Sequence, residues 1–315
     1  MKAVVTGGAG FIGSTLVDRL LEEGNEVVAL DRLEDRNSEN KRFLQPHIGQ
    51  EGFRLDEVNV LDLNGLRQSV VGADVIFHLV MQAGAGSETD PVKAQMSNTA
   101  GTLNVLLAAK NAGVRRVVSS SSSSVYGNGR YFPWKETDPT VPVSPYGASQ
   151  LAAEEYCRLF HELYGLQSVS LRFFTVYGPR QRPDAAISVF TERALSGQHP
   201  QIYGDGTQTG DFTFISDVVG AIRLCADCPD PKGRPLNICS GEGTTINQVV
   251  RRILDAAGRP DLEPEYLPPR QGEAEQIRGD NTQAKELLGW ESKVPMEKGL
   301  VEFVEWYKKF GDLIR

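Results

Sequence analysis

The 315-residue sequence contains few cysteines, few histidines and no long apolar run. Its four cysteines are Cys157, Cys225, Cys228 and Cys239, and two of them form a C-x-x-C motif. Because no second pair accompanies that motif, we expect core cysteines and not a zinc or redox centre. The four histidines show no metal-ligand spacing, so no metal site is expected.

Positive charge is also scarce. The chain carries 33 Lys and Arg against 41 Asp and Glu, a net charge of -8. Such a balance disfavours general binding to nucleic acid or to membrane surfaces. No apolar run is long enough to span a bilayer and no secretory signal is visible, so we expect a cytoplasmic protein. The length allows one large or two smaller domains.

The first 31 residues have the order strand, glycine turn, helix and strand. Gly7, Gly10 and Gly13 stand between a β-branched run and a helical repeat of leucine and valine. This unit sets a pyrophosphate on a helix N-terminus. Asp31 ends the second strand, where a carboxylate accepts hydrogen bonds from the adenosine ribose and favours NAD, although Arg32 beside it leaves NADP open. The alternative is a glycine turn that only packs a helix tightly.

Strand and helix patterns alternate through the first half of the chain. The expected strands span residues 2–6, 27–30, 53–60, 75–79, 114–121 and 168–173, and the expected helices 63–71, 91–112 and 146–164. This rhythm predicts an α/β fold with a doubly wound, mostly parallel sheet of the Rossmann type. We expect this domain to cover residues 1–174 and to receive part of 211–240. Residues 175–315 are expected to form a smaller, irregular α/β domain over the open end of the sheet.

The candidate chemistry lies where the strands end, because ligands of open α/β sheets bind beyond the carboxyl ends of the strands. Four segments meet there: the glycine loop, the residues after Leu79, the serine run 119–124 and the segment after Phe173. Tyr146 begins the next helix, and Gln150 follows on the same face because positions four apart are neighbours. A tyrosine that only packs at a helix start is the alternative for Tyr146.

Nine motifs in one order resemble the extended short-chain dehydrogenases/reductases, and within them the NAD-dependent nucleotide-sugar epimerases and dehydratases. UDP-glucose 4-epimerase is the closest type. The motifs are TGGAGFIGS (6–14), FHL…QAG (77–84), GTLNVLLAA (101–109), SSSSVYG (121–127), PVSPYGAS (142–149), LRFF…VYGPRQRPD (171–184), YGDG (203–206), DFTFI…DVV (211–219) and LNICSGE (236–242). Together they span nearly the whole chain.

The resemblance implies NAD as cofactor and a UDP-sugar as substrate. In such enzymes a hydride passes from C4 of a UDP-hexose to NAD while a tyrosine phenolate removes the hydroxyl proton. The 4-keto sugar then turns over and takes the hydride back on its other face. By position, Tyr146 matches the catalytic tyrosine and Ser122 its hydroxyl partner. Residues 1–174 are then the NAD-binding domain and 175–315 the nucleotide-sugar-binding domain.

The resemblance also assigns contacts by position. Those expected for the cofactor are Gly7, Gly10, Phe11, Ile12, Asp31, Val60, Leu79, Val80, Gln82, Asn98, Ser120, Tyr146, Gln150 and Phe173. Those expected for the substrate are Ser122, Tyr146, Thr175, Val189, Tyr203 and Arg270. Arg270 matches an arginine that grips the diphosphate, a task that suits the guanidinium fork.

Position 150 departs from the family pattern of tyrosine, three residues and lysine. The lysine holds the nicotinamide ribose and its charge lowers the pKa of the tyrosine, whereas Gln150 offers hydrogen bonds and no cation. A phenol with a pKa of ~10 is only about one part in a thousand ionised at pH 7. Loss of the cation therefore predicts chemistry slowed by about a hundred- to a thousandfold.

Three further sites depart from the pattern. Val80 and Met81 replace two alanines and crowd the cofactor. Thr175 replaces an asparagine that meets the substrate phosphate, and Gly210 replaces an arginine that meets the diphosphate. Each of these changes weakens an expected contact with a ligand.

We expect a UDP-hexose 4-epimerase that is slowed by Gln150. A non-catalytic NAD- and UDP-sugar-binding protein is the alternative, because the lysine and the arginine are both missing. A dehydratase or decarboxylase of the same fold is a weaker reading, since those relatives place an acidic residue in or near the serine motif and residues 122–124 are all serine. Ala85 and Gly86 lack the arginine of some uronic-acid-specific relatives, which favours neutral hexoses. Relatives pair helices 91–112 and 146–164 into a four-helix interface, so a homodimer is expected.

Overall fold

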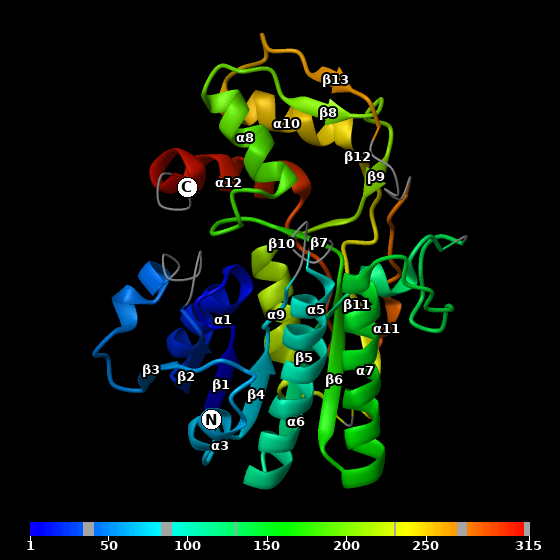
Figure 1. The fold of residues 1–315 in the computed structure, drawn as a ribbon. Helices are drawn as coiled ribbons and strands as arrows, with labels where there is room; N and C mark the ends of the chain where they lie inside the picture. Colours follow the sequence, from blue (N-terminus) through cyan, green and yellow to red (C-terminus); the bar gives the residue numbers. More distant parts are fainter. Residues whose placement is uncertain (34–40, 83–89, 130, 230, 270–275, 312–315) are drawn as a thin grey trace.

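The computed structural model describes residues 1–33, 41–82, 90–129, 131–229, 231–269 and 276–311. Its centre is a seven-stranded sheet with the order β11-β6-β5-β4-β1-β2-β3, and every neighbouring pair is parallel (Figure 1). The strands are β1 (Lys2–Thr6), β2 (Glu26–Asp31), β3 (Phe53–Glu57), β4 (Val75–His78), β5 (Arg116–Ser122), β6 (Gln167–Phe173) and β11 (Pro235–Ile238). The predicted doubly wound Rossmann sheet is confirmed.

Helices cover both faces of this sheet. They are α1 (Phe11–Glu22), α3 (Leu63–Ser69), α5 (Pro91–Gln95), α6 (Gly101–Ala112), α7 (Pro145–Tyr164), α9 (Ile215–Cys225) and α11 (Thr282–Leu288). Side chains alternate along a strand, so Ala3 and Val5 pack in the core layer that includes α1 and α9, and Val4 packs in the layer that includes α3, α6 and α7. The central strands β1, β2 and β4 are buried on both faces, which explains why they are mainly apolar.

Two elements differ from the sequence expectation. The expected helix 91–112 is divided, because a π-helical turn, Met96–Ala100, separates α5 from α6. This turn buries Asn98 and Thr99, whereas an unbroken α-helix presents a different set of side chains inward. The expected strand 53–60 ends at Glu57, and residues 58–60 run on to the rim of a cleft.

The remaining elements lie beyond the carboxyl ends of the strands (Figure 1). They are β7 (Thr175–Tyr177), α8 (Ala186–Leu195), β8 (Gln201–Tyr203), β9 (Thr209–Gly210), β10 (Phe212–Phe214), β12 (Thr244–Thr245), α10 (Ile246–Ala257), β13 (Glu265–Leu267) and α12 (Met296–Phe310). The chain returns to the main sheet in between, since β11 pairs with β6 and α9 packs against α1. The division into domains at residues 174 and 175 stays a prediction.

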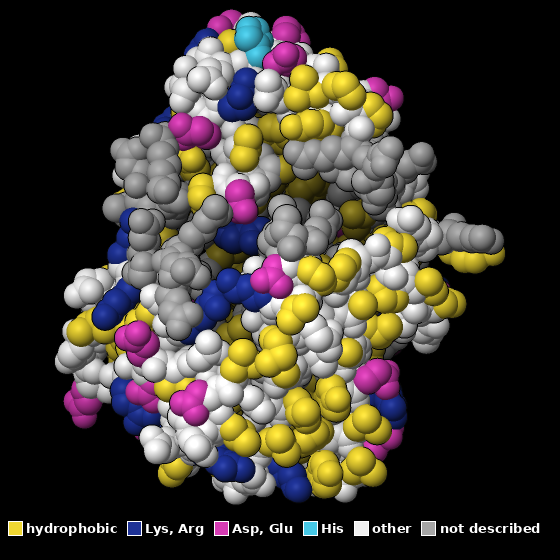
Figure 2. Space-filling model, in the orientation of Figure 1, with side chains coloured by type: hydrophobic (Ala, Val, Ile, Leu, Met, Phe, Trp, Pro, Cys, Tyr) yellow, Lys and Arg dark blue, Asp and Glu magenta, His cyan; other side chains and the backbone are white. Residues whose placement is uncertain are grey.

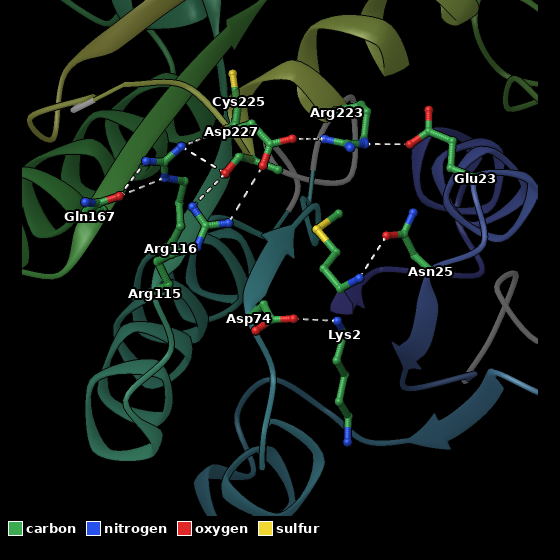
Figure 3. A network of polar contacts seen from close by, with 12 residues as sticks. Lys2, Glu23, Asn25, Asp74, Arg115, Arg116, Gln167, Arg223, Cys225 and Asp227 are labelled. Carbon is green, nitrogen blue, oxygen red and sulfur yellow. Dashed lines mark hydrogen bonds and ion pairs between the residues drawn. The ribbon is translucent and has the colours of Figure 1, made fainter.

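A polar network connects α1 and α9 to the amino-terminal ends of the strands, which lie opposite the cleft (Figure 3). Arg116, at the start of β5, donates to the carbonyl oxygens of Cys225 at 2.8 Å and Ala226 at 3.0 Å. A cation there complements the negative end of the α9 dipole. Arg223 donates to Glu23 at 2.6 Å and so joins α9 to the end of α1. These contacts stabilise the fold without touching the cleft.

All four cysteines are buried, so the expected core cysteines are confirmed. Among the described residues, no three His, Cys, Asp or Glu side chains group as metal ligands would. Within the same part of the chain, no helix combines the length and apolar character needed to cross a membrane.

Candidate active site

A cleft of ≈ 510 Å³ opens at the carboxyl ends of the strands. Strand register explains why separate segments meet there: Thr6 pairs with His78, and Ser122 pairs with Phe173, so the residues that follow these strand ends converge. Figure 2 shows Lys and Arg side chains on the same face, between the two parts of the molecule. Most of the predicted ligand contacts line this cleft: Gly7, Gly10, Phe11, Ile12, Asp31, Val60, Leu79, Val80, Gln82, Ser120, Ser122, Tyr146, Phe173 and Thr175.

The glycine loop has a shape that side chains would destroy. Gly7 has a φ of +71°, and a Cβ on it would lie 3.1 Å from the backbone of Leu79 and Val80. A Cβ on Gly13 would lie 2.0 Å from the carbonyl oxygen of Gly7. Gly10 precedes α1, whose first turn has no capping side chain, so its N–H groups face the cleft without a competing acceptor from a cap. These features suit a pyrophosphate.

Asp31, the last residue of β2, contacts the glycine loop through its side chain. Its carboxylate accepts hydrogen bonds from the backbone N–H of Ala9 and of Leu33, both at 3.2 Å. Burial raises the pKa of Asp31, and these two hydrogen bonds oppose the rise. The side chain therefore has a fixed direction at the end of β2, where a ribose hydroxyl would donate to it. Arg32 lines the same part of the cleft.

Tyr146, at the start of α7, lines the cleft, and three side chains surround its hydroxyl. Ser122 and Gln150 hydrogen-bond to this hydroxyl. The hydroxyl also donates to Met81 Sδ at 2.6 Å. Burial raises the pKa of Tyr146, while the hydrogen bonds to Ser122 and Gln150 and the charge of Arg182 act in the opposite direction. The phenol is therefore protonated at neutral pH.

Two predicted contacts lie behind the cleft wall and act on residues that line it. Gln150 is 2 % exposed and reaches Tyr146 from one helical turn below. Asn98 is 1 % exposed, and its amide binds the backbone of Gln82 through both of its ends, at 2.7 Å and 3.1 Å. Neither side chain lines the cleft. Their direct contact with a cofactor stays a prediction.

Two predicted substrate contacts are not brought to the cleft lining. Val189 lies half-exposed on α8 and Tyr203 ends β8, and neither is among the lining residues. Arg270 lies outside the described residues. At Gly210 a Cβ would meet the ring of Phe212 at 2.7 Å, so the ring occupies the space where the side chain of an arginine would begin.

Sequence reasoning missed the loop after β7. Gln181 and Arg182 both line the cleft, and the Oε1 of Gln181 is buried without a hydrogen-bond partner among the described residues. Arg182 pairs with Asp184 at 3.3 Å, and both side chains are about half exposed. The motif VYGPRQRPD follows a strand end, so the rule that placed Thr175 here could also have found these two residues.

Comparison with known sequences gives a match to the NAD dependent epimerase/dehydratase family over residues 3–239. The chain belongs to this family. The match spans both the glycine loop and the Ser122–Tyr146 pair, and this family depends on NAD. The glycine loop and Asp31 fit that cofactor on the geometry given above.

Family members with known activities resemble the chain over its whole length. UDP-glucose 4-epimerase of Mycolicibacterium smegmatis is 40% identical over 313 residues, which cover 98% of this chain and 99% of that protein. The solved structure of UDP-glucose 4-epimerase with UDP-glucose from Thermotoga maritima has a TM-score of 0.90 at 37% identity and covers 98% of this chain and 99% of its own. UDP-glucuronic acid 4-epimerase of Bacillus cereus, in complex with UDP-glucuronic acid and NAD, has a TM-score of 0.92 at 30% identity, with coverage of 98% and 100%.

Proposed function

We propose that the protein is an NAD-dependent 4-epimerase of a UDP-hexose. One observation carries the proposal: the Tyr146 hydroxyl, in contact with Ser122, lines the same cleft as the glycine loop. A phenol that accepts a proton once it is ionised thus lies within one cavity with a site for a dinucleotide. The resemblance to UDP-glucose and UDP-glucuronate 4-epimerases supports the substrate class.

The residues of the cleft have separate roles in the proposed reaction. NAD, when bound, would accept a hydride from the sugar and return it. In its ionised, phenolate form, Tyr146 takes the proton of the sugar C4 hydroxyl, and it gives the proton back after the sugar has turned over. Ser122 hydrogen-bonds the Tyr146 hydroxyl and so holds the phenol oxygen in place for the sugar hydroxyl.

Anionic groups of the substrate need cationic partners in the cleft. Arg182 supplies a guanidinium there, which suits a diphosphate. Arg270 is the predicted second partner. Since Gly210 brings no charge and Phe212 fills its place, we expect weaker binding of the diphosphate than in relatives with arginine at that position.

The test is proton NMR of the NAD-supplemented protein with UDP-glucose, UDP-galactose, their N-acetyl forms and UDP-glucuronic acid. Growth of the 4-epimer signal with one of them supports the proposal and identifies the sugar. If neither the protein nor its Gln150→Lys variant changes any of these sugars, the proposed epimerase activity is wrong.

A second candidate is a protein that binds NAD and a UDP-sugar without turnover. The specific observation in its favour is the surroundings of Tyr146, where Gln150 brings no charge and Met81 Sδ accepts a hydrogen bond from the protonated hydroxyl. This candidate predicts saturable binding of UDP-sugar by calorimetry with no product by NMR. An active Gln150→Lys variant would identify an epimerase disabled at one position instead.

The protein is further proposed to form a homodimer through α5, α6 and α7. Figure 2 shows apolar side chains over the region of α6 and α7, and Val92 of α5 and Leu163 of α7 are 71% and 67% exposed. An apolar face of this kind suits a copy of itself. Light scattering should give twice the monomer mass. Val92→Asp should give a monomer, whereas Val71→Asp, an exposed valine between α3 and β4, should not.

A further inference from the structure

Met81 lies directly against the hydroxyl of Tyr146. The two side chains line the same cleft, and the Tyr146 hydroxyl donates to Met81 Sδ at 2.6 Å. A thioether has no proton to give and accepts only weakly, so this contact exists only while the tyrosine keeps its own proton. The family pattern has a small alanine at this position, which could not reach the hydroxyl.

The backbone around both residues is fixed, so their contact follows from the fold. Asn98 accepts a hydrogen bond from the N–H of Gln82, next to Met81, and donates to the Gln82 carbonyl oxygen. The same amide group donates to Ser149 Oγ at 2.9 Å, and Ser149 Oγ donates to the carbonyl oxygen of Tyr146 at 2.8 Å. One buried asparagine therefore sets the distance between the backbones that carry the sulfur and the phenol.

The side chain of Met81 has freedom that its backbone lacks. It is only partly buried, and it packs at the border of the core cluster that contains α1 and α9. Methionine is unbranched and has three rotatable bonds, so it can repack at little cost. The thioether can therefore leave the phenol while the backbone stays in place.

We propose that Met81 is a positioning residue that keeps the Tyr146 hydroxyl in its proton-donating form and covers the approach to its oxygen. A sugar hydroxyl then reaches Tyr146 only after the Met81 side chain has turned aside. The inference rests on the proposed function, because it takes a sugar hydroxyl as the group that replaces the sulfur. UDP itself has no hexose and does not need the space.

The other described groups around the Tyr146 hydroxyl do not favour its protonated form in the way that the sulfur of Met81 does. Ser122 and Gln150 are neutral and each has a proton to donate, so they can accommodate a phenolate. Arg182 is the charged side chain that acts on Tyr146 among the described residues, and its charge favours the phenolate. Among the described side chains that act on the phenol, Met81 favours only the protonated form. Removing the sulfur should therefore lower the pKa of Tyr146.

The first experiment follows the ionisation of Tyr146 and does not depend on activity. The protein is labelled with 3-fluorotyrosine and titrated by fluorine NMR, and Tyr146→Phe identifies the resonance. Met81→Leu keeps the volume and removes the sulfur, and such swaps are well tolerated. We expect Met81→Leu to lower the pKa of Tyr146 by roughly half a unit and Met81→Ala, which also admits water, by roughly one unit or more. An unchanged pKa in Met81→Leu overturns the proposed role of the sulfur.

The second experiment measures binding to the NAD-loaded protein by calorimetry. Met81→Ala should bind the UDP-hexose at least about threefold more tightly than the original protein and should bind UDP with unchanged affinity. Equal effects on both ligands, or no effect on either, overturn the proposed covering of Tyr146. If no variant binds any UDP-hexose, the proposed function is wrong, and the titration still decides whether Met81 holds the proton.

Discussion

Glu154 of α7 and Arg172 of β6 form a buried ion pair beneath the serine run. Arg172 donates through Nε and Nη2 to the two carboxylate oxygens at 2.9 Å and 2.7 Å. The side chain of Arg172 is 4% exposed and that of Glu154 is 7% exposed. Ser121 donates to the same carboxylate and the hydroxyl of Tyr126 accepts from Arg172, so the pair has further hydrogen bonds. It joins the helix that carries Tyr146 to two strands of the sheet.

We expect Glu154→Ala to lower the free energy of unfolding by about 3–5 kcal/mol, because it leaves a buried guanidinium without its counter-charge. Urea unfolding measures the loss. The control is Arg158→Ala on the same helix, whose pairs with Glu155 and Glu162 are exposed to solvent and should leave the midpoint nearly unchanged. Equal midpoints for both variants would show that the buried pair contributes no more than a surface pair.

Gln150→Lys should speed sugar turnover by about a hundred- to a thousandfold. A cation one helical turn from Tyr146 stabilises the phenolate, so the pKa of the phenol falls and the rise of kcat/KM with pH moves to lower pH. The measurement is a pH profile of kcat/KM for both proteins. Gln150→Met has a similar length and no charge, and it should give no gain; a gain with methionine would show that charge is not the reason.

Gly13→Ala should abolish binding of NAD. Its Cβ would lie 2.0 Å from the Gly7 carbonyl oxygen, so the glycine loop has to move. Fluorescence titration with NAD measures the loss. The matched control is Gly220→Ala, also in a helix, where the nearest atom to a new Cβ lies 4.0 Å away. That variant should bind NAD normally and gain about 0.5–1 kcal/mol of stability from helix propensity. Normal NAD binding by Gly13→Ala would contradict the proposed role of the loop.

His78 should make stability depend on pH. Its ring lies fully buried between the hydroxyls of Thr6 and Thr102, and burial lowers the pKa of His78 to about 4. Because an unfolded histidine has a pKa near 6.5, the unfolded chain binds one proton more at pH values between about 4 and 6.5. Stability should therefore fall by roughly 3 kcal/mol as the pH drops through this window.

Urea unfolding at several pH values between about 6.5 and 5 tests this, because few carboxyl groups titrate there. His78→Gln should flatten the slope by one proton, whatever it does to the absolute stability. His199→Gln, at the surface, should keep the original slope. The prediction fails if the two variants have the same slope.

The sequence by itself determined the Rossmann sheet and the place of the ligand cleft. Strand and helix periods are local properties, and the glycine spacing in residues 7–13 reflects a backbone path that only glycine can follow. The rule that ligands bind at the carboxyl ends of parallel strands then brings Ser122, Tyr146 and Thr175 to one cavity.

Only the tertiary structure decided which side chains meet inside the cleft. The π-helical turn directs Asn98 to the backbone of Gln82, and it has no signature in the periodicity of residues 91–112. The contact of Met81 with Tyr146 joins residues 65 positions apart, and it depends on the hydrogen bonds that fix both backbones. Such contacts result from packing between distant segments, which no local pattern of residues encodes.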